Sequence, residues 1–297
     1  MRGRWLIAAL ASTTVFGCRP EKNTLAGLQH SAVVTARVER LKKTLADHEA
    51  AVDGRPIARW LMPPELREIS GLALTPDGRA LTHGDENGEI WEIDYRSGIL
   101  VKHFFLGDPT VKGDFEAITV GNGLVYLLDS KGKIYSFKEG ADGARVKYNY
   151  FDTGLKKDCE FESMVYDARF DALVLACKHD HDASVHDAIV LYRVSLASAD
   201  STSQLTKISV PLGAANGGKS YHPSDITIDP ISGNYVLVSS LEKALIEITP
   251  RGELVFGRPL PPGHDQPEGV AITKDSVLLI SDEAKSNPGA ITLYKWP

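Results

Sequence analysis

Three glutamates stand at equivalent points of recurring apolar segments and could bind a metal ion together. Glu116, Glu162 and Glu268 each lie near the start of a segment with the apolar content of a buried strand. Carboxylates that lie close together repel one another and raise one another's pKa, and a bound cation removes this repulsion. An all-oxygen shell without Cys or His suits a hard divalent ion, and calcium tolerates irregular geometry better than magnesium. The pattern therefore predicts a calcium site, and the alternative is a set of solvated glutamates around a wet pore.

A wider set of polar residues recurs in the same phase. It consists of Ser70 and Ser224, which align with the glutamates, and of Asp85, Asp129, Lys178 and Asp282, which end the next apolar segment. We expect members of this set at the same mouth of a central channel, although some of the acidic ones will be ordinary turn residues. If the site is catalytic, Lys178 or a histidine at the mouth would assist the reaction.

The segments that carry these residues form an internal repeat. The motifs ISGLA, FEAIT, FESMV, PSDIT and PEGVA each open an apolar segment, and a turn and further apolar segments follow in each unit. Successive motifs are spaced by 46, 46, 62 and 44 residues. A period in the forties with several short strands per unit is typical of β-propeller blades. We predict an all-β, five-bladed β-propeller over residues 55–297, in which the first strand of each blade lines the channel.

Two features of the repeat bear on the number of blades. The long third unit holds the insertion HDHDASVHD and a predicted loop near 196–222, and a degenerate sixth blade in this interval is the alternative. The fifth unit has room for only three strands before Pro297. We expect Arg55–Leu61 to supply its outer strand, which would join the chain ends and leave no free sheet edge.

The N-terminal residues differ from the rest and predict export. Residues 1–17 have a basic start and a short apolar run, which is typical of a secretory signal peptide and too short to span a membrane. The run ends in VFGC, which resembles a bacterial lipobox and predicts lipidation of Cys18. The alternative is ordinary signal cleavage beside an incidental cysteine. We expect attachment to the membrane through this lipid, in the bacterial cell envelope, and Arg19 favours the outer membrane, facing the periplasm.

Residues 18–54 are expected to form a lipid-anchored tether. Val34, Val38, Leu41 and Leu45 follow one another at steps of three and four, which predicts an amphipathic helix between about residues 30 and 52. The helix either serves as a spacer or packs on nothing. Hydrophobic residues make up 43% of the chain and the net charge is −6, so a soluble domain without a nucleic-acid partner is expected, as a monomer.

Two further cysteines, Cys159 and Cys177, lie in the third unit. Segments 162–167 and 172–177 should form an antiparallel hairpin that turns at Ala168–Phe170, which places the two cysteines nearly opposite each other on neighbouring strands. Such a pair is within reach of a disulfide, which the oxidising envelope permits. The alternative is two free buried cysteines that pack as small hydrophobic residues.

The ordered set of motifs resembles one known family. The sequence ISGLA, DFEAI, EFESMVYD with LVLACK, HPSDI and QPEGVA is similar to the SdiA-regulated family of bacterial β-propellers, which are envelope proteins distantly similar to NHL-repeat propellers. The resemblance covers residues 55–297. It implies a five-bladed propeller with a calcium site at the channel, and the family's FE and EG glutamates match Glu116, Glu162 and Glu268. A hydrolase activity has been suggested for the family by analogy, which is weak support for a reaction.

Two functions follow from these patterns. The chain has no G-x-S-x-G elbow, no P-loop and no dinucleotide fingerprint, and no asparagine stands in the aligned column as in propeller lactonases. The favoured prediction is therefore an envelope lipoprotein whose calcium-binding propeller binds a small molecule or an envelope protein. The alternative is a calcium-dependent hydrolase of an ester, lactone or phosphoester at the channel mouth.

Overall fold

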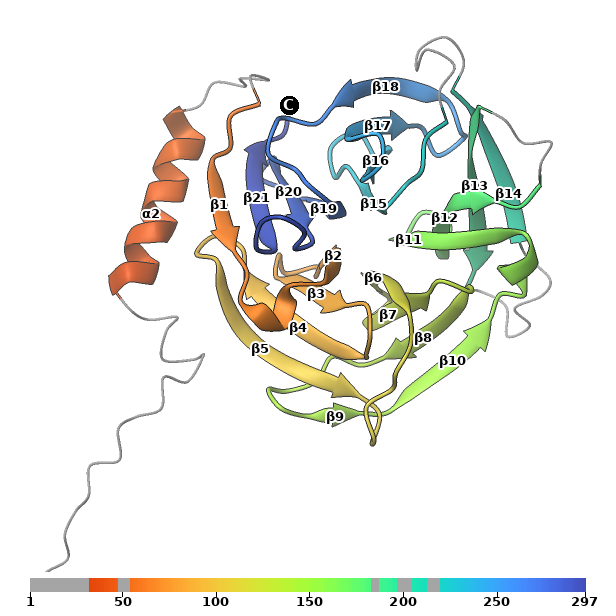
Figure 1. Ribbon diagram of the computed structural model, residues 1–297, viewed down its shortest axis with the longest axis horizontal. Helices are drawn as coiled ribbons and strands as arrows, with labels where there is room; N and C mark the ends of the chain where they lie inside the picture. The colour runs from red at the N-terminus through yellow and green to blue at the C-terminus, as the bar shows by residue number, and fades with distance from the viewer. Residues whose placement is uncertain (1–31, 48–53, 183–186, 197–204, 213–219) are drawn as a thin grey trace, which may run out of the picture.

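The computed structural model describes residues 32–47, 54–182, 187–196, 205–212 and 220–297, which form a ring of five sheets beside one helix (Figure 1). Each sheet is a blade with four antiparallel strands, to which blade one adds a short parallel strand, and the first strand of each blade lies nearest the centre of the ring. The first strands of neighbouring blades contact one another around the whole ring. The predicted five-bladed propeller is confirmed, and the six-bladed alternative is wrong.

The blades follow one another in chain order. Blade one contains β2 (Ile69–Leu74), β3 (Ala80–Gly84), β4 (Glu89–Asp94) and β5 (Ile99–Leu106), with the short β9 (Arg145–Val146) added parallel to β5. Blade two contains β6 (Phe115–Gly121), β7 (Leu124–Asp129), β8 (Lys133–Phe137) and β10 (Tyr148–Asp152). Blade three contains β11 (Cys159–Asp167), β12 (Ala172–Asp180), β13 (Ala188–Ser195) and β14 (Leu205–Pro211).

Blade four contains β15 (Asp225–Ile228), β16 (Tyr235–Ser239), β17 (Ala244–Ile248) and β18 (Leu254–Pro259). Blade five contains β19 (Pro267–Ile272), β20 (Val277–Asp282), β21 (Ala290–Lys295) and, as its outer strand, β1 (Ala58–Leu61). The short 3-10 helices η1 (Pro64–Leu66) and η2 (Leu155–Lys157) precede blades one and three.

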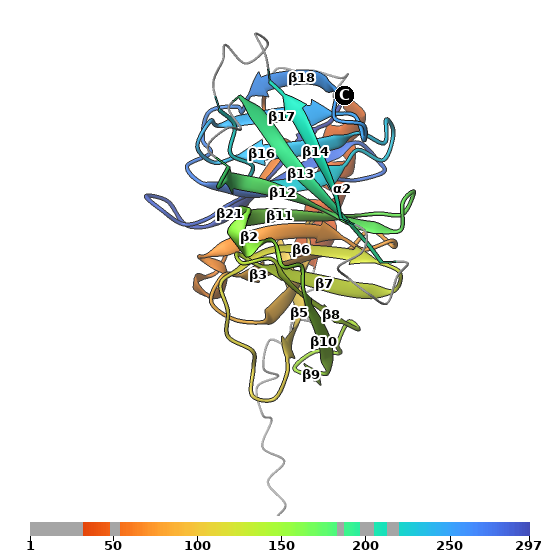
Figure 2. The same ribbon diagram turned by 90° about the vertical axis from the view of Figure 1, so that its right-hand side faces the viewer.

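The long third unit is more regular than its sequence predicts. Strand β14 lies inside the interval 196–222, which was expected to be a loop, and β12 extends into the predicted insertion as far as Asp180. In the side view, β11 to β14 lie in sequence order across the blade (Figure 2). The loop prediction is wrong for 205–211 because an outer strand buries few of its side chains, so its apolar alternation is weak.

The ring closes as predicted, with the segment before blade one completing blade five. Strand β1 pairs with β21, Ala58 opposite Leu293. The Trp60 indole N–H donates to the carbonyl of Tyr95 at 2.7 Å, which ties the closing strand to blade one. A Cβ at Gly98 would lie 2.5 Å from Trp60 Cγ, so only glycine leaves room for the indole.

The helix α2 (Ala32–Asp47) packs on the propeller beside β1 (Figure 1). Its Leu41 side chain is buried in the apolar cluster between blades five and one. The Arg37 guanidinium lies 5.4 Å from the centre of the Trp60 ring and donates to the carbonyl of Ser97 at 2.9 Å. No helix in the described part of the chain is long and apolar enough to cross a bilayer. The predicted lipidation site, Cys18, lies outside the described residues.

The apolar core lies between the blades and leaves the channel mouths to polar residues and turns. The described residues form five apolar clusters, and each cluster joins two neighbouring blades around the ring. Because each blade buries both faces of its middle strands, β7, β12, β16 and β20 read as continuous apolar runs. This packing fixes the innermost strands, and therefore the position of the side chains at each mouth.

Candidate functional site

The three predicted glutamates occupy β-bulges at the start of the innermost strands. In each of these strands the pairing with the second strand skips one residue, which is Glu116 in β6, Glu162 in β11 and Glu268 in β19. Ser70 is skipped in the same way in β2. A bulge leaves one residue unpaired and re-aims its side chain. This local geometry explains why a polar residue recurs at the start of strands that are otherwise buried.

Charged residues from several blades lie near Glu116 and act on its pKa. Burial raises the pKa of Glu116 to about 8, and the carboxylate of Asp114 adds to the effect. The carboxylates of Glu268 and Asp85 raise it as well, whereas the ammonium group of Lys178 acts in the opposite direction. Residues from four blades therefore share one electrostatic environment, which we call the acidic mouth.

Lys178 supplies the positive charge at this mouth. Its ammonium group forms an ion pair with Oε1 of Glu162, which is only 8% exposed. The second carboxylate oxygen of Glu162, Oε2, is buried and has no hydrogen-bond partner within the part of the chain that the structure describes. Asp85 Oδ1 is in the same situation. The acidic mouth thus holds buried carboxylate oxygens that another cation or donor would satisfy.

Further acidic residues border this mouth. Burial raises the pKa of Glu283, and so do the charges of Glu268, Asp85 and Glu68. Burial likewise raises the pKa of Glu268, which accepts hydrogen bonds from the side chains of Ser240, Gln266 and Ser224. The carboxylates of the acidic mouth are those of Glu68, Asp85, Asp114, Glu116, Glu162, Glu268 and Glu283. Such a concentration of negative charge favours binding of a cation or a positively charged ligand.

Two of the predicted mouth residues have other roles. Asp129 caps a turn, because its Oδ1 accepts the backbone N–H groups of Lys131 and Lys133 at 3.0 and 2.9 Å. Asp282 is buried against His264, with 2.7 Å between its Oδ2 and the imidazole Nδ1. The other imidazole nitrogen lies 2.7 Å from the hydroxyl of Tyr294. Both aspartates end a second strand as predicted and form hydrogen bonds within their own blade, whereas Oδ1 of Asp282 is buried and has no partner among the described residues.

The arrangement is not a preformed metal cage. Among the described residues, no three His, Cys, Asp or Glu side chains lie together so that they could bind one metal ion as they stand. Glu162 is paired with Lys178 instead. A divalent ion at this mouth would therefore have to displace or rearrange the lysine.

Sequence reasoning missed Asp225, which lies at the centre of the ring. It occupies the column held by Gly71, Ala117, Ser163 and Gly269 in the other blades, directly after the bulge position. Its Oδ2 accepts the backbone N–H of Val270 at 2.8 Å, and it also accepts the N–H of Leu72. Full burial raises its pKa well above the usual range. A single carboxyl therefore joins the inner strands of blades four, five and one.

The sequence contained a signal for two other missed residues. Glu68 and Asp114 stand two positions before Ser70 and Glu116, so they form a second column in the same phase. Glu283 follows the predicted Asp282 directly and belongs to the acidic residues that the sequence places at the end of the second strands. The recurrence of polar residues in phase over the whole strand entrance, rather than at one position, is the signal for Glu68 and Asp114.

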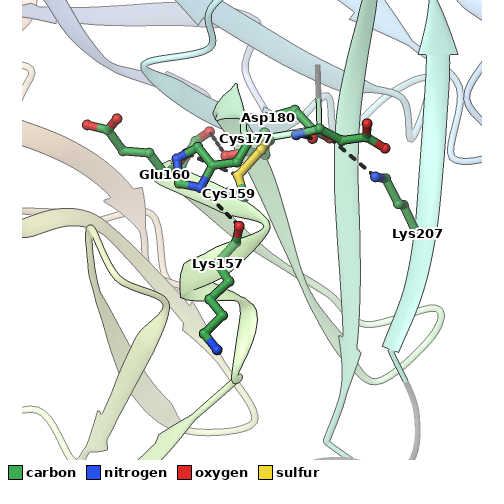
Figure 3. The surroundings of a disulfide bond; sticks show 10 residues. Lys157, Cys159, Glu160, Cys177, Asp180 and Lys207 are labelled. Carbon is green, nitrogen blue, oxygen red and sulfur yellow. Dashed lines mark hydrogen bonds and ion pairs between the residues drawn. A yellow bond between two sulfur atoms is a disulfide. The ribbon is translucent and has the colours of Figure 1, made fainter. Parts of the chain in front are cut away.

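Blade three carries the predicted pair of cysteines. The structure joins Cys159 and Cys177 in a disulfide, with 5.7 Å between the Cα atoms (Figure 3). The hairpin turns where predicted, but the two cysteines are not direct partners, since Cys159 lies opposite Asp180 and Cys177 opposite Phe161. The hairpin turn, in which Asp167 lies opposite Ala172, sets this register, and the two skipped residues, Glu162 in β11 and Lys178 in β12, offset each other. Because Lys178 follows Cys177 directly, the disulfide anchors the strand that carries the mouth lysine.

Comparisons with known proteins support the fold and no finer statement. The chain matches no family model and no curated protein. Among solved structures, it is similar to glutaminyl cyclase from Myxococcus xanthus, with 12% identity, a TM-score of 0.53, and 81% of this chain and 95% of that chain covered. A luciferin-regenerating enzyme is similar with 10% identity, a TM-score of 0.50, and 80% and 95% covered. Streptogramin B lyase shares 15% identity, with a TM-score of 0.46 and 81% and 72% covered.

At such identities the likeness shows the propeller fold alone. Glutaminyl cyclase is a β-propeller-type protein, and its likeness to this chain agrees with the five-bladed ring. Membership of the SdiA-regulated family is not confirmed by these comparisons and stays a prediction. Function must therefore be argued from the residues of the mouth itself.

Proposed function

We propose that this protein is an envelope lipoprotein whose propeller is a ligand- or partner-binding module, with a calcium ion bound at the acidic mouth. The observation that supports the proposal is that Oε2 of Glu162 and Oδ1 of Asp85 are buried and unpartnered among the described residues, at a mouth where carboxylates from several blades act on one another's pKa. Buried carboxylates without a partner are costly, and a bound cation offsets that cost.

The donor set suits calcium in its chemistry. Glu116, Glu162 and Glu268 would hold the ion, since all three offer carboxylate oxygens, and Ser224 lies close enough to hydrogen-bond Glu268. Calcium accepts six to eight such ligands in flexible geometry. When bound, the ion would supply a fixed positive charge that attracts an anionic group of a ligand or partner. Without the ion, Lys178 supplies the positive charge that pairs with Glu162.

Calcium-dependent thermal stability tests this site. We expect the melting temperature of the wild type to rise with calcium, because an ion that binds only the folded state stabilises it. The variant Glu116→Gln/Glu162→Gln/Glu268→Gln should lose this rise. An equal rise in wild type and variant would place the ion elsewhere.

A matched control separates the site from net charge. The variant Glu65→Gln/Asp142→Asn/Glu253→Gln removes three exposed carboxylates outside the acidic mouth and changes the net charge by the same amount. It should keep the calcium response of the wild type. Loss of the response in both variants would mean that calcium acts through bulk charge rather than through the mouth.

The lipoprotein part of the proposal rests on the sequence around Cys18. Replacement of Cys18 by Ser should release the protein from the membrane fraction and abolish labelling by a fatty acid. Wild-type protein that is soluble and begins at another residue would overturn this part and leave the calcium site untouched.

One observation favours the hydrolase as a second candidate. A group with a pKa of about 8, as burial produces for Glu116, exchanges a proton near neutral pH, which is what acid–base catalysis requires. Lys178 stands beside it as a positive charge for a developing oxyanion. A panel of esters, lactones and phosphoesters, assayed with calcium and with chelator, tests this candidate. Turnover that Glu116→Gln abolishes would establish catalysis, and no turnover of any substrate would leave the binding module.

A further inference from the structure

The mouth of the channel opposite the acidic one holds a cavity. Its volume is about 730 Å³, which is within the usual range for pockets that bind small molecules. We call it the turn mouth, because the ends of the first strands and the turns that follow them surround it. The strand ends contribute Leu74, Val120, Tyr166 and Ile272, and the turns contribute Pro76, Arg96, Ala168, Pro230 and Lys274.

The turn mouth continues into an apolar stretch of the channel. A smaller cavity of about 150 Å³ is lined by the same four strand ends and by apolar residues that precede them, such as Ile118 and Ile226. Asp225 directly precedes Ile226, and its bonds to Val270 and Leu72 join the strands on the acidic side of this stretch. The two mouths are therefore separate sites with different chemistry.

Tyr166 forms one wall of the turn mouth, and its ring packs closely against Gly121. A Cβ at Gly121 would lie 2.1 Å from Cγ of Tyr166, so the glycine leaves the space that the aromatic ring occupies. The Tyr166 hydroxyl lies 2.8 Å from Asn122 Oδ1 and 3.0 Å from Asp171 Oδ1, which fixes the ring. A rigid, half-buried aromatic wall is a feature of pockets that bind apolar ligands.

At the turn mouth the carboxylates accept hydrogen bonds, whereas two cations have no ion-pair partner in the described ranges. Asp77 is held by Arg79 and Thr75, whose hydrogen bonds lower its pKa to about 2. Asp275 accepts a hydrogen bond from the hydroxyl of Thr273 at 2.5 Å. The cations Arg96 and Lys274 form no ion pair with any residue in the described ranges, and Arg96 lies 4.5 Å from the centre of the Tyr95 ring.

From this contrast we infer that the turn mouth is a second binding site, for a small amphiphilic anion with an apolar body and a single acidic group. The apolar body would lie against Tyr166 and the strand ends, and the acidic group would pair with Arg96 and Lys274. The guanidinium of Arg79 pairs with the carboxylate of Asp77, and Thr273 donates a hydrogen bond to that of Asp275; neither carboxylate forms an ion pair with Arg96 or Lys274 in the described ranges. The inference does not depend on calcium at the acidic mouth.

Two fluorescent probes with the same apolar body test the inference. The anionic probe is 8-anilinonaphthalene-1-sulfonate, the neutral probe is N-phenyl-1-naphthylamine, and decanoate serves as a non-fluorescent competitor with a carboxylate. Native wild-type protein should bind both probes in one saturable site, and decanoate should displace both. If wild-type protein binds neither probe, the site does not exist.

Charge variants separate recognition of the anion from recognition of the apolar body. Arg96→Gln/Lys274→Gln should bind the anionic probe about tenfold more weakly, the equivalent of about 1.4 kcal/mol, and the neutral probe as well as wild type does. The control Lys131→Gln/Lys156→Gln removes two exposed cations from connections on the acidic side and should change neither. Equal binding of the anionic probe by wild type and Arg96→Gln/Lys274→Gln would overturn the assignment of the acidic group.

Occupation of the cavity itself is tested by two more substitutions. Val120→Phe fills space at the strand end and should weaken both probes by at least about tenfold. Should this variant not fold, Ala168→Glu serves instead, because Ala168 is exposed in a turn and an added carboxylate should weaken the anionic probe alone. Folded variants that bind both probes like the wild type would overturn the site. The triple glutamine variant of the acidic mouth should bind both probes normally, which separates this inference from the proposed function.

Discussion

The two mouths of the channel are built from the same five strands but by different means. At the acidic mouth, bulges turn Glu116, Glu162 and Glu268 out of the strand pattern, and charge dominates the site. At the turn mouth the strands keep their alternation until they end, and residues such as Val120 and Tyr166 line a cavity by shape. A propeller channel thus offers a polar site where strands begin irregularly and an apolar site where they end regularly.

This difference determines whether a change of charge or a change of side-chain volume destabilises each mouth more. Glu162 and Lys178 form a pair at the acidic mouth whose loss leaves a charge behind. The turn mouth depends on space, as the close approach of Tyr166 to Gly121 shows. Changes of charge should therefore have their largest effect on stability at the acidic mouth, and changes of volume should have theirs at the turn mouth.

The largest effect is expected from Lys178→Met, which removes the partner of a carboxylate that is 8% exposed. Breaking such a pair costs about 3 to 5 kcal/mol, because the remaining charge stays buried. Chemical denaturation would measure the loss, and added calcium should restore more stability in the variant than in the wild type. Lys131→Met, in an exposed turn on the same face, should stay within about 0.5 kcal/mol. A Lys178→Met variant as stable as wild type, with no response to calcium, would show that charge does not govern this mouth.

The disulfide should be the next largest contribution, since it anchors the strand before Lys178. A closed loop with a sequence separation of 18 is stabilised by about 3 kcal/mol. Cys159→Ala/Cys177→Ala should lose this stability in denaturant melts. With Cys18 blocked, denatured and unreduced wild-type protein should show no reactive thiol. Two thiols per chain would contradict the bond.

A smaller loss is expected where the two mouths meet. Asp225→Ala leaves the N–H groups of Val270 and Leu72 without their acceptor, at a cost of about 2 to 3 kcal/mol in the melts. Ser163→Ala, at the aligned position in blade three, serves as a control and should cost less than about 1.5 kcal/mol, since Ser163 makes one long bond of 3.4 Å. Equal losses would mean that Asp225 does not join the blades.

The volume of the turn mouth is tested by Gly121→Ala. The new Cβ would meet the Tyr166 ring at 2.1 Å, so the ring must move, at a cost of about 2 kcal/mol. Gly257→Ala is the control, because a Cβ there would meet Ile246 at an ordinary 3.6 Å. Probe binding at the turn mouth should weaken in Gly121→Ala alone. Unchanged stability and binding would show that the aromatic wall is not rigid.

The same contrast explains how much the sequence could predict. The blades, the closing strand Arg55–Leu61 and the column Glu116, Glu162 and Glu268 recur in phase, so period and residue type sufficed. The turn mouth could not be predicted, because Val120 and Tyr166 are indistinguishable in sequence from ordinary core residues.

Local irregularities were equally hidden. A bulge depends on how two strands pair, which residue types do not encode, so the Lys178 pair with Glu162 could not be derived. Asp225 stood in a column of small residues, where it looked like one more strand start.

The smallest expected effect is a pH dependence of stability. It reports on the acidic mouth alone. Burial raises the pKa of Glu116 from 4.5 to about 8, so between these values the folded state holds a proton that the unfolded state has released. Stability should therefore fall as pH rises through this window, by up to about 1.4 kcal/mol per pH unit for one such group. The measurement is denaturation of metal-free protein in chelator from pH 5 to pH 8.

Glu116→Gln replaces the carboxyl by an amide that does not titrate. The stability of this variant should therefore fall less steeply with pH than that of the wild type. Glu253→Gln, an exposed residue in the turn before β18, should keep the wild-type slope. Calcium should flatten the wild-type curve as well, because a bound cation favours ionised carboxylates. If Glu116→Gln and wild type show the same slope, the carboxylate is solvated, and the acidic mouth is a wet pore rather than a cation site.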